Sequence, residues 1–338
     1  SRRATVVAVQ DHGYVLVAER RRGAGPRERL WRIRAKRVVV AGGAIERPLA
    51  FAGNDLPGVM LAGAVRDYLA LWGVAAGARA VVLTATDDAY RTALALRGAG
   101  VTVKAVLDLR PEADGALPEA ARAAGLRVLT GTGVARAFGG RRLERVEVCD
   151  AAGAGAARES IGCDLLAVSG GWTPSVHLWS QPGGGVCWDA AAGAFLPDPD
   201  RPPRGADGAP FVIPAGAAAG APGLAAALAS GQRAGRQAAE EVGLVPGDEA
   251  APLGEEPGET PPAQVWAVPA RAGAKLRAKA FVDFQNDVKL SDLDLAAREG
   301  YVSVEHAKRY TTLGMATDQG KTSNLIGLAA LAAATGRA

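Results

Sequence analysis

The stretch "ARAVVLTATDDAYRTALALRGAGVTVKAVLD", residues 78–108, decides the fold class of this chain. Two mainly apolar runs, at 80–83 and 103–107, flank a polar turn and an alanine- and leucine-rich segment with helical spacing. A strand, a helix and a second strand within about thirty residues form a βαβ unit, in which the two strands are parallel. The chain is therefore predicted to be an α/β protein built on a parallel sheet.

The segments on either side of this unit extend the same pattern. A helix is predicted for "GAVRDYLALWG" at 63–73, another for "EAARAAG" at 119–125, and a buried strand for "CDLLAVSGG" at 163–171. Residues 63–204 are therefore expected to form one Rossmann-like domain.

The residues outside 63–204 are predicted to form another domain, which the Rossmann-like domain interrupts. The first forty residues have the short apolar runs and turns of a β-meander, and "RVVVAGGAIERP" at 37–48 indicates a buried strand that enters a tight turn. "FVIPAGAAAG" at 211–220 repeats the strand and glycines before an alanine-rich helix. We expect 1–62 and 205–243 to form part of a first dinucleotide-binding domain of the FAD or NAD type.

The rest of the chain is predicted to be a linker and a small module. Residues 244–274 are rich in proline, glycine and glutamate without periodicity, which indicates a linker. Residues 275–338 begin with a strand-like segment and continue with helical patterns. In a glutathione-reductase-like fold such a meander follows a glycine-rich βαβ unit, and no such unit precedes it here. We therefore expect the sequence to be a fragment of a longer chain.

Composition excludes several classes of protein. Hydrophobic residues make up 49% of the 338 residues, which is typical of a globular chain. The net charge is +4 and the arginines are interpreted as scattered, so nucleic-acid binding is not expected. No apolar run is long enough for a transmembrane helix, and the chain begins without a signal-peptide pattern. Cys149, Cys163 and Cys187 form no C-x-x-C motif and are expected to be reduced structural residues in a cytoplasmic protein.

The turn of the βαβ unit lacks the glycine-rich fingerprint of a dinucleotide site. It carries Thr84, Thr86 and Asp87 where glycine would let the backbone approach a pyrophosphate. Asp87 and Asp88 would repel phosphate at the helix N-terminus, and we interpret them as helix-capping residues. The inserted domain is therefore expected to keep the Rossmann shape without standard nicotinamide binding.

Two glycine-rich turns of the other domain are better candidates for holding a cofactor. The predicted cofactor-binding residues are Gly42, Gly43, Glu46 and Arg47 in the first turn, and Gly216 and Gly220 in the second. Ala217 follows Gly216, where flavoproteins with two dinucleotide-binding domains usually have an aspartate that bonds the ribityl chain. A dinucleotide phosphate can still be attracted by the helix N-terminus near Gly220, and the alternative is that both turns only allow tight packing.

The segment "GMATDQGKTSN" at 314–324 is nearly a phosphate-binding loop. Gly314 lies six residues before Gly320, so the spacing is one residue too long for G-x-x-x-x-G-K-[ST]. The preceding residues are charged and helical in pattern, whereas such a loop follows a buried strand. The sequence therefore argues against a nucleotide hydrolase and requires another explanation for this loop.

Three longer segments resemble one known family. They are "RVVVAGGAIERPLAFAGNDLPGVMLAGAVRDYL", "DLLAVSGGWTPSVHLWSQ" and "AFVDFQNDV" with "SVEHAKRYTTLGMATDQGKTSN". Together they are similar to the α subunit of heterotetrameric sarcosine oxidase over nearly the whole chain. The resemblance implies a glutathione-reductase-like fold with two dinucleotide-binding domains, followed by a helical module like bacterioferritin-associated ferredoxin. It also implies that the N-terminal ferredoxin-like region, the first Rossmann unit and the C-terminal folate-binding domain are absent from this sequence.

The resemblance implies a place in a multi-subunit flavoenzyme that oxidises sarcosine to glycine. In that family FAD lies in the β subunit, FMN at the interface with the β subunit, NAD in the intact α subunit, and tetrahydrofolate at the C-terminal domain. Smaller subunits complete the complex, and no independent catalysis is expected from this fragment. The alternative is a non-catalytic scaffold subunit of a related amine, opine or proline dehydrogenase complex, with a decayed dinucleotide site.

The resemblance also gives an explanation for the loop at 314–324. In related dehydrogenase subunits the module holds a [2Fe–2S] cluster, and its ligand positions correspond here to Asp283, Gln285, Asp318 and Ser323. Without thiolates no cluster is expected. The predicted cofactor contacts, toward the FMN phosphate, are Gln319, Lys321, Thr322, Ser323 and Asn324. The alternative is a helix N-cap with a polar surface.

Overall fold

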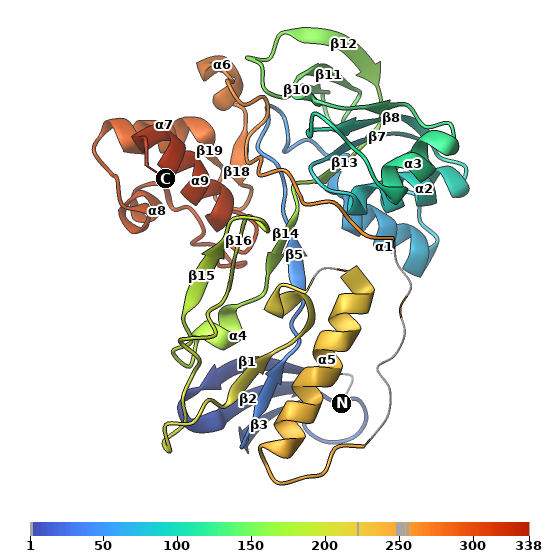
Figure 1. Ribbon diagram of the computed structural model, residues 1–338. Helices are drawn as coiled ribbons and strands as arrows, with labels where there is room; N and C mark the ends of the chain where they lie inside the picture. The colour runs from blue at the N-terminus through green and yellow to red at the C-terminus, as the bar shows by residue number, and fades with distance from the viewer. Residues whose placement is uncertain (1–2, 222, 248–253, 255–256, 338) are drawn as a thin grey trace. The chain divides into compact units, whose positions relative to one another are not determined.

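The computed structural model describes residues 3–221, 223–247, 254 and 257–337, and it divides into two compact units (Figure 1). Unit 1 comprises Ser1–Ile45 and Thr173–Glu256, and unit 2 comprises Glu46–Trp172 and Pro257–Ala338. The chain passes from one unit to the other within the short strands β5 (Ala44–Glu46) and β14 (Trp172–Pro174).

Unit 2 is built on a five-stranded parallel sheet of order β6-β13-β7-β8-β9. The strands are β6 (Val59–Leu61), β13 (Leu165–Ser169), β7 (Arg79–Thr84), β8 (Thr102–Asp108) and β9 (Val128–Leu129). The predicted βαβ unit is β7, α2 (Asp88–Gly98) and β8, which confirms the α/β fold class with a parallel sheet.

Both faces of this sheet are covered, which explains why its strands are continuously apolar. Ala80 and Val82 of β7 pack in a core with the helices α1 (Ala62–Trp72), α2 and α3 (Ala116–Ala123). Val81 and Leu83 pack in a second core with an antiparallel sheet. That sheet consists of β10 (Thr132–Phe138), β11 (Arg145–Asp150) and β12 (Ala157–Gly162).

The C-terminal module is part of unit 2. It contains α6 (Ala274–Arg277), the hairpin β18 (Phe281–Asp283) and β19 (Val288–Lys289), and the helices α7 (Leu290–Arg298), α8 (Val304–Thr311) and α9 (Asn324–Thr335). Leu290, Leu293, Leu313 and Ile326 form its core together with Ala50. The strand and helices predicted for this module are confirmed.

Residues 257–268 of the predicted linker pack on unit 2. The Ala263 N–H donates to the Ala85 carbonyl at 2.9 Å, and the Val268 N–H donates to the Ala50 carbonyl at 2.9 Å. Val268 is 2% exposed and belongs to the core between the two sheets. A run of proline and glycine predicts a lack of helix or strand, but it does not exclude burial. Residues 248–253 and 255–256 of the predicted linker lie outside the described residues.

Unit 1 contains the predicted meander of β1 (Ala4–Gln10), β2 (Tyr14–Arg20) and β3 (Glu28–Arg34), with the 3-10 turn η1 (Asp11–Gly13) between the first two strands. It also contains a parallel pair, β4 (Val38–Val40) with β17 (Val212–Pro214). The remaining elements are α4 (His177–Ser180), β15 (Val186–Asp189), β16 (Ala194–Pro197), η2 (Gly216–Ala219) and α5 (Gly223–Glu240).

The boundaries between the units differ from those expected at 62 and 204. Leu49 and Phe51 are buried between the two sheets of unit 2, so residues 46–62 belong there. Trp179 packs with Val9 and Phe211 in the core of unit 1, so residues 173–204 belong to unit 1. The physical reason is that each boundary follows the burial of apolar side chains, which the strand and helix pattern does not reveal.

Within the part of the chain that the structure describes, no helix is both long enough and apolar enough to cross a membrane.

Candidate functional site

The carboxyl edge of the parallel sheet in unit 2 carries a buried charge network. Arg110 Nη2 donates to Asp87 Oδ1 and to Asp108 Oδ2, both at 2.7 Å, and Arg110 Nε donates to Asp108 Oδ1 at 3.0 Å. The Tyr90 hydroxyl donates to Asp108 Oδ2 at 2.8 Å. Burial opposes the charge of Arg110, but the hydrogen bonds and charges of Asp108 and Asp87 outweigh burial and raise the pKa of the guanidinium.

Thr260, from the second stretch of sequence in unit 2, covers this edge of the sheet. The Thr260 N–H and hydroxyl donate to Asp87 Oδ2 at 2.7 and 2.9 Å, and Arg110 Nη1 donates to Thr260 Oγ1 at 2.7 Å. Ligands of open α/β sheets bind at the carboxyl ends of the strands. Here protein atoms and a carboxylate lie where a pyrophosphate would approach the turn between β7 and α2, so these residues do not fit a dinucleotide.

The expected capping role of Asp87 is wrong, because its side chain makes no capping bond to α2 from the N-cap position. Asp88 lies in the first turn of α2. Asp87 is held by Arg110 and Thr260, and Asp88 receives two bonds from the Arg66 guanidinium, at 3.0 and 3.1 Å. An arginine forms strong charge-assisted hydrogen bonds with a carboxylate, and the sequence pattern did not identify Arg110 and Arg66 as these partners.

Glu46 and Arg47, both predicted to bind cofactor, are buried in unit 2, at 5% and 3% exposure. Glu46 Oε2 accepts from the Gly63 N–H at 2.7 Å, while Glu46 Oε1 and the Ser169 hydroxyl have no hydrogen bond of normal geometry among the described residues. Burial raises the pKa of Glu46 to about 7, although the nearby Ser169 hydroxyl and the Gly63 N–H act to lower it. Glu46 is therefore a buried carboxyl group that can hold a proton near neutral pH.

Arg47 lies in the same region of unit 2. Its guanidinium lies 4.8 Å from the centre of the Trp266 ring, and Nε donates to the Gly170 carbonyl at 3.3 Å. Burial lowers the pKa of Arg47 to about 10. A Cβ atom on Gly171 would lie 2.3 Å from Arg47 Nη2, so this side chain requires the glycine beside it. Glu46 and Arg47 thus belong to unit 2, whereas the glycine turns with which they were grouped belong to unit 1.

The two glycine turns of unit 1 emerge at the same end of a parallel strand pair. Val40 is paired with Pro214, so the turn with Gly42 and Gly43 and the turn with Gly216 and Gly220 both follow the carboxyl ends of these strands. The φ angles are 72° at Gly43, 64° at Gly216 and 78° at Gly220. A Cβ atom at Gly43 would meet nothing within 4 Å, so this turn has an open side. Both turns therefore lie at the same end of this strand pair, and the role of their glycines in cofactor binding stays a prediction.

Two backbone N–H groups of the loop 314–324, those of Gly320 and Thr322, are bonded within the loop and not directed at a ligand. Asp318 accepts from the Gly320 N–H at 2.9 Å, from the Thr322 N–H at 3.3 Å and from the Thr322 hydroxyl at 2.9 Å. Burial would raise the pKa of Asp318, but these hydrogen bonds outweigh it and lower the pKa. Lys321 is exposed, with Nζ 3.2 Å from the Asp318 carbonyl. Gln319 Nε2 donates to the Ala316 carbonyl at 2.9 Å.

The glycines of this loop are required by the packing of Asn324. A Cβ atom on Gly314 would lie 2.0 Å from Asn324 Oδ1, and one on Gly320 would lie 2.2 Å from the same side chain. Ser323 is 1% exposed and makes no side-chain capping bond to α9. Ser323 Oγ and Asn324 Oδ1 are buried without a partner among the described residues. The two glycines that make this segment resemble a phosphate-binding loop are thus needed to make room for the Asn324 side chain. The Ser323 side chain does not cap α9.

Asp283 links the hairpin of the C-terminal module to this loop. Its Oδ1 accepts from the Gln285 and Asn286 N–H groups at 2.9 and 3.2 Å, and its Oδ2 accepts from the Gly314 N–H at 2.8 Å. All three cysteines of the chain lie outside the module. The residues at the expected ligand positions therefore do not fit an iron–sulfur cluster. Across the described residues, no group of three or more His, Cys, Asp or Glu could hold a metal ion.

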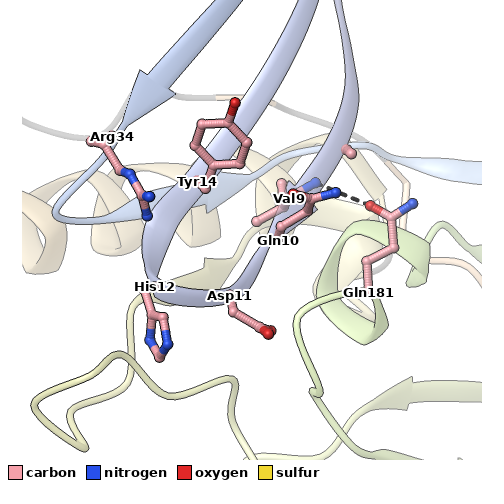
Figure 2. A pocket seen from close by; sticks show the side chains of 8 residues that line it. Val9, Gln10, Asp11, His12, Tyr14, Arg34 and Gln181 are labelled. Atoms are coloured by element: carbon pink, nitrogen blue, oxygen red, sulfur yellow. Dashed lines mark hydrogen bonds between the residues drawn. The ribbon is translucent and has the colours of Figure 1, made fainter.

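Unit 1 also has a polar hollow of about 530 Å³ that the sequence analysis did not identify. Figure 2 shows Asp11 and His12 at the turn between β1 and β2, with the Arg34 side chain beside Tyr14. The Arg34 guanidinium lies 4.8 Å from the centre of the Tyr14 ring, and Gln181 Oε1 accepts from the Val9 N–H at 3.0 Å. The sequence "DHG" predicts a turn between two strands, but it does not predict that a hollow lies beside this turn.

The arginines are clustered, which corrects the interpretation that they are scattered. Nine of the 39 Lys and Arg residues fall within residues 20–37, where Glu28 is the single acidic residue. Strand β3 in this segment is exposed along its whole length. The rest of the chain is therefore acidic on balance, and the hairpin of β2 and β3 forms a basic surface.

Comparison with known proteins relates the chain to one kind of subunit. Residues 277–338 match the family model described as the sarcosine oxidase A3 domain. The chain is 43% identical over 312 residues to the sarcosine oxidase subunit alpha of Rhizobium meliloti (strain 1021), covering 92% of this chain and 29% of the relative. It is 41% identical over 358 residues to the same subunit of Corynebacterium sp. (strain P-1), covering 99% of this chain and 35% of the relative. The chain thus spans about a third of the length of these relatives.

Solved structures with a similar fold are redox enzymes. L-proline dehydrogenase from P. horikoshii has a TM-score of 0.71 at 22% identity, covering 99% of this chain and 60% of that chain. Thioredoxin reductase from T. acidophilum has a TM-score of 0.50 at 18% identity, covering 71% of this chain and 72% of that chain.

The parallel sheet of unit 2 and these similarities define the fold of flavoproteins with two dinucleotide-binding domains. Within that class the chain is related to the α subunit of sarcosine oxidase, so the resemblance found in the sequence is confirmed. Those relatives are named as the alpha subunit of an oxidase.

Proposed function

We propose that this chain is part of the α subunit of a sarcosine-oxidase-like flavoenzyme, which converts sarcosine to glycine in the cytoplasm. The observation that carries the proposal is the identity of 40–43% to sarcosine oxidase α subunits over 92–99% of the chain. In the complex, flavin in a β subunit accepts the hydride, and smaller subunits and a folate-binding domain complete the assembly. The role of this chain is to bind NAD in the intact subunit and to form part of the wall of an FMN site at the β-subunit interface.

The loop 314–324 supports the FMN part of the proposal. Lys321 is exposed, so its ammonium group can contact a phosphate borne by the β-subunit interface. Thr322 lines a mostly apolar cavity of about 190 Å³ together with Leu61, Val168 and Phe284. Two buried oxygen atoms of the same loop, Ser323 Oγ and Asn324 Oδ1, have no hydrogen-bond partner within the part of the chain that the structure describes. Gln319 and Thr322 are neutral and already bonded within the loop. Lys321 carries a charge, and its ammonium group makes one bond to the Asp318 carbonyl and keeps two further N–H donors, so we assign the phosphate contact to Lys321.

Replacing Lys321 with methionine should lower the FMN content or the flavin reduction potential of the assembled enzyme. The substitution keeps the stem of the side chain and removes the charge-assisted contact. FAD content should stay at the wild-type level, and the stability of the chain should hardly change because Lys321 is exposed. The measurements are flavin analysis and sarcosine-dependent peroxide formation by the full-length polypeptide assembled with its partner subunits.

Lys275→Met is the matched control, because Lys275 is an exposed lysine of the same module. Wild-type FMN content, potential and electron transfer in Lys321→Met would contradict the loop assignment alone. A wild-type assembly that does not oxidise sarcosine would contradict the proposed function itself.

The chain by itself should bind NAD weakly or not at all. The inserted domain has no glycine-rich turn, and its sheet edge is closed by Asp87, Arg110 and Thr260. The loss of two charge-assisted hydrogen bonds of about 1.5–3 kcal/mol each weakens binding by about 10²- to 10⁴-fold. Titration calorimetry with NAD would test this expectation, and a micromolar dissociation constant would disprove it.

A second candidate function is a non-catalytic scaffold in a related amine, opine or proline dehydrogenase complex. The closed sheet edge of unit 2 favours it, because the inserted domain then has only a structural role. The absence of bound NAD from the purified full-length complex, together with normal assembly, would favour this candidate over the dinucleotide-binding role.

A further inference from the structure

Unit 2 contains a cavity of about 250 Å³ with a strongly basic lining. It lies where the turn at Gly53 and Asp55, the end of β10 and the start of the C-terminal module meet. Its charged lining residues are Arg136, Lys279, Lys289 and Asp55, three cations and one carboxylate. This cavity is separate from the closed edge of the parallel sheet and from the loop 314–324.

The three cations of this cavity are only partly balanced by the Asp55 carboxylate. Among the described residues, Arg136, Lys279 and Lys289 form no ion pair within 4.0 Å. The Arg136 guanidinium lies 4.5 Å from the centre of the Phe138 ring, and that of Arg145 lies 3.8 Å from the same ring centre. Like charges held together beside aromatic rings repel one another, and a bound anion offsets this repulsion.

The size and walls of the cavity limit what it can accept. Phe138 and Phe281 contribute apolar surface, which strengthens the interaction of an anion with the cations around it. Gly53 and Gly139 form part of the wall without side chains, and a Cβ atom on Gly53 would lie 2.5 Å from the Ala137 carbonyl oxygen. The volume is below the range of roughly 300–1,000 Å³ that is usual for drug-sized ligands. It suits a small anion rather than a whole dinucleotide.

We propose that this cavity binds a small multivalent oxyanion of the phosphate class, held by Arg136, Lys279 and Lys289. A guanidinium matches the geometry of phosphate oxygens, and the two lysines supply point charges. Asp55 is the one group that opposes binding. The proposal does not depend on the proposed function, because no step of it involves flavin, NAD or sarcosine.

The test is a calorimetric titration of the chain with pyrophosphate and with inorganic phosphate, at ionic strength kept constant with sodium chloride. We expect saturable binding, with pyrophosphate tighter than phosphate because it carries more charge. Arg136→Met and Lys279→Met should each raise the dissociation constant about tenfold, the loss of one charge-assisted contact. Lys104→Met removes an exposed lysine of β8 outside the cavity and should leave the dissociation constant unchanged.

Asp55→Asn should increase the affinity for pyrophosphate several-fold, because it removes the one negative charge in the lining. A gain in affinity cannot come from misfolding, so this variant complements those that lose binding. Tighter binding in this variant together with weaker binding in Lys279→Met supports the proposal. The absence of saturable binding, or equal dissociation constants for wild type, Lys279→Met and Asp55→Asn, would overturn it. A tenfold loss in Lys104→Met would also overturn it, since it would show non-specific attraction to a basic surface.

Discussion

Replacement of Arg110 by methionine is expected to lower the free energy of unfolding of unit 2 by about 3–5 kcal/mol, the usual cost of removing one partner from a buried ion pair. Arg110 donates to both Asp87 and Asp108, which are 1% and 0% exposed. Methionine preserves much of the side-chain volume. The loss therefore comes from two carboxylates that remain buried without their shared cation.

The measurement is urea denaturation of the wild-type chain and the variant. Arg145→Met is the control: Arg145 has a side-chain exposure of 43% and pairs with Glu147 at 3.5 Å, so its loss should cost less than about 1 kcal/mol. Adding Asp108→Asn to Arg110→Met should recover part of the loss, because it removes one of the two uncompensated charges. A cost for Arg110→Met no larger than that of Arg145→Met would show that the network does not stabilise unit 2.

Replacement of Glu46 by glutamine is expected to stabilise the chain at pH 8 by about 2–3 kcal/mol. The pKa of Glu46 is raised from its ordinary value of 4.5 to about 7 in the folded chain, mainly by burial. The folded state then binds the proton more tightly than the unfolded state. The stability that this proton provides is fully present below about pH 4.5 and is lost as pH rises through about 7. At about 1.36 kcal/mol per pKa unit, the shift corresponds to about 3 kcal/mol.

Glutamine cannot ionise, and its side-chain oxygen can still accept from the Gly63 N–H that now bonds Glu46. The variant should therefore lose the decrease in stability between pH 5 and 8 that Glu46 causes in the wild type. Urea denaturation at several pH values measures this slope. Glu159→Gln is the control, because the Glu159 side chain is 37% exposed and its hydrogen bond with Arg127 lowers its pKa, so its removal should not stabilise the chain at pH 8. Equal slopes for wild type and Glu46→Gln would contradict the buried proton.

The pattern of residues by itself determined the elements and the fold class. The run at 78–108 predicted β7, α2 and β8, and the first forty residues predicted the three strands of the meander. These predictions succeed because strand and helix periods are local properties, set by which face of a segment is buried. The tight turns at Gly43 and Gly216 after short apolar strands were also predictable, since they depend on neighbouring residues, but the pairing of those two strands was not predicted.

Only the tertiary structure decided how the candidate sites are built. Asp87 was expected to cap a helix, but its carboxylate accepts from Thr260, 173 residues away in the sequence. Asn54 donates to the Phe281 carbonyl across 227 residues, and Val268 of the expected linker is buried between two sheets. A pattern read along the chain cannot specify such partners, because the free energy of burying a polar group depends on which distant donor or cation the fold brings to it. For the same reason the sequence motif that grouped Glu46 with Gly42 did not predict its surroundings. In the fold Glu46 is a buried carboxyl group that accepts a hydrogen bond from the Gly63 N–H.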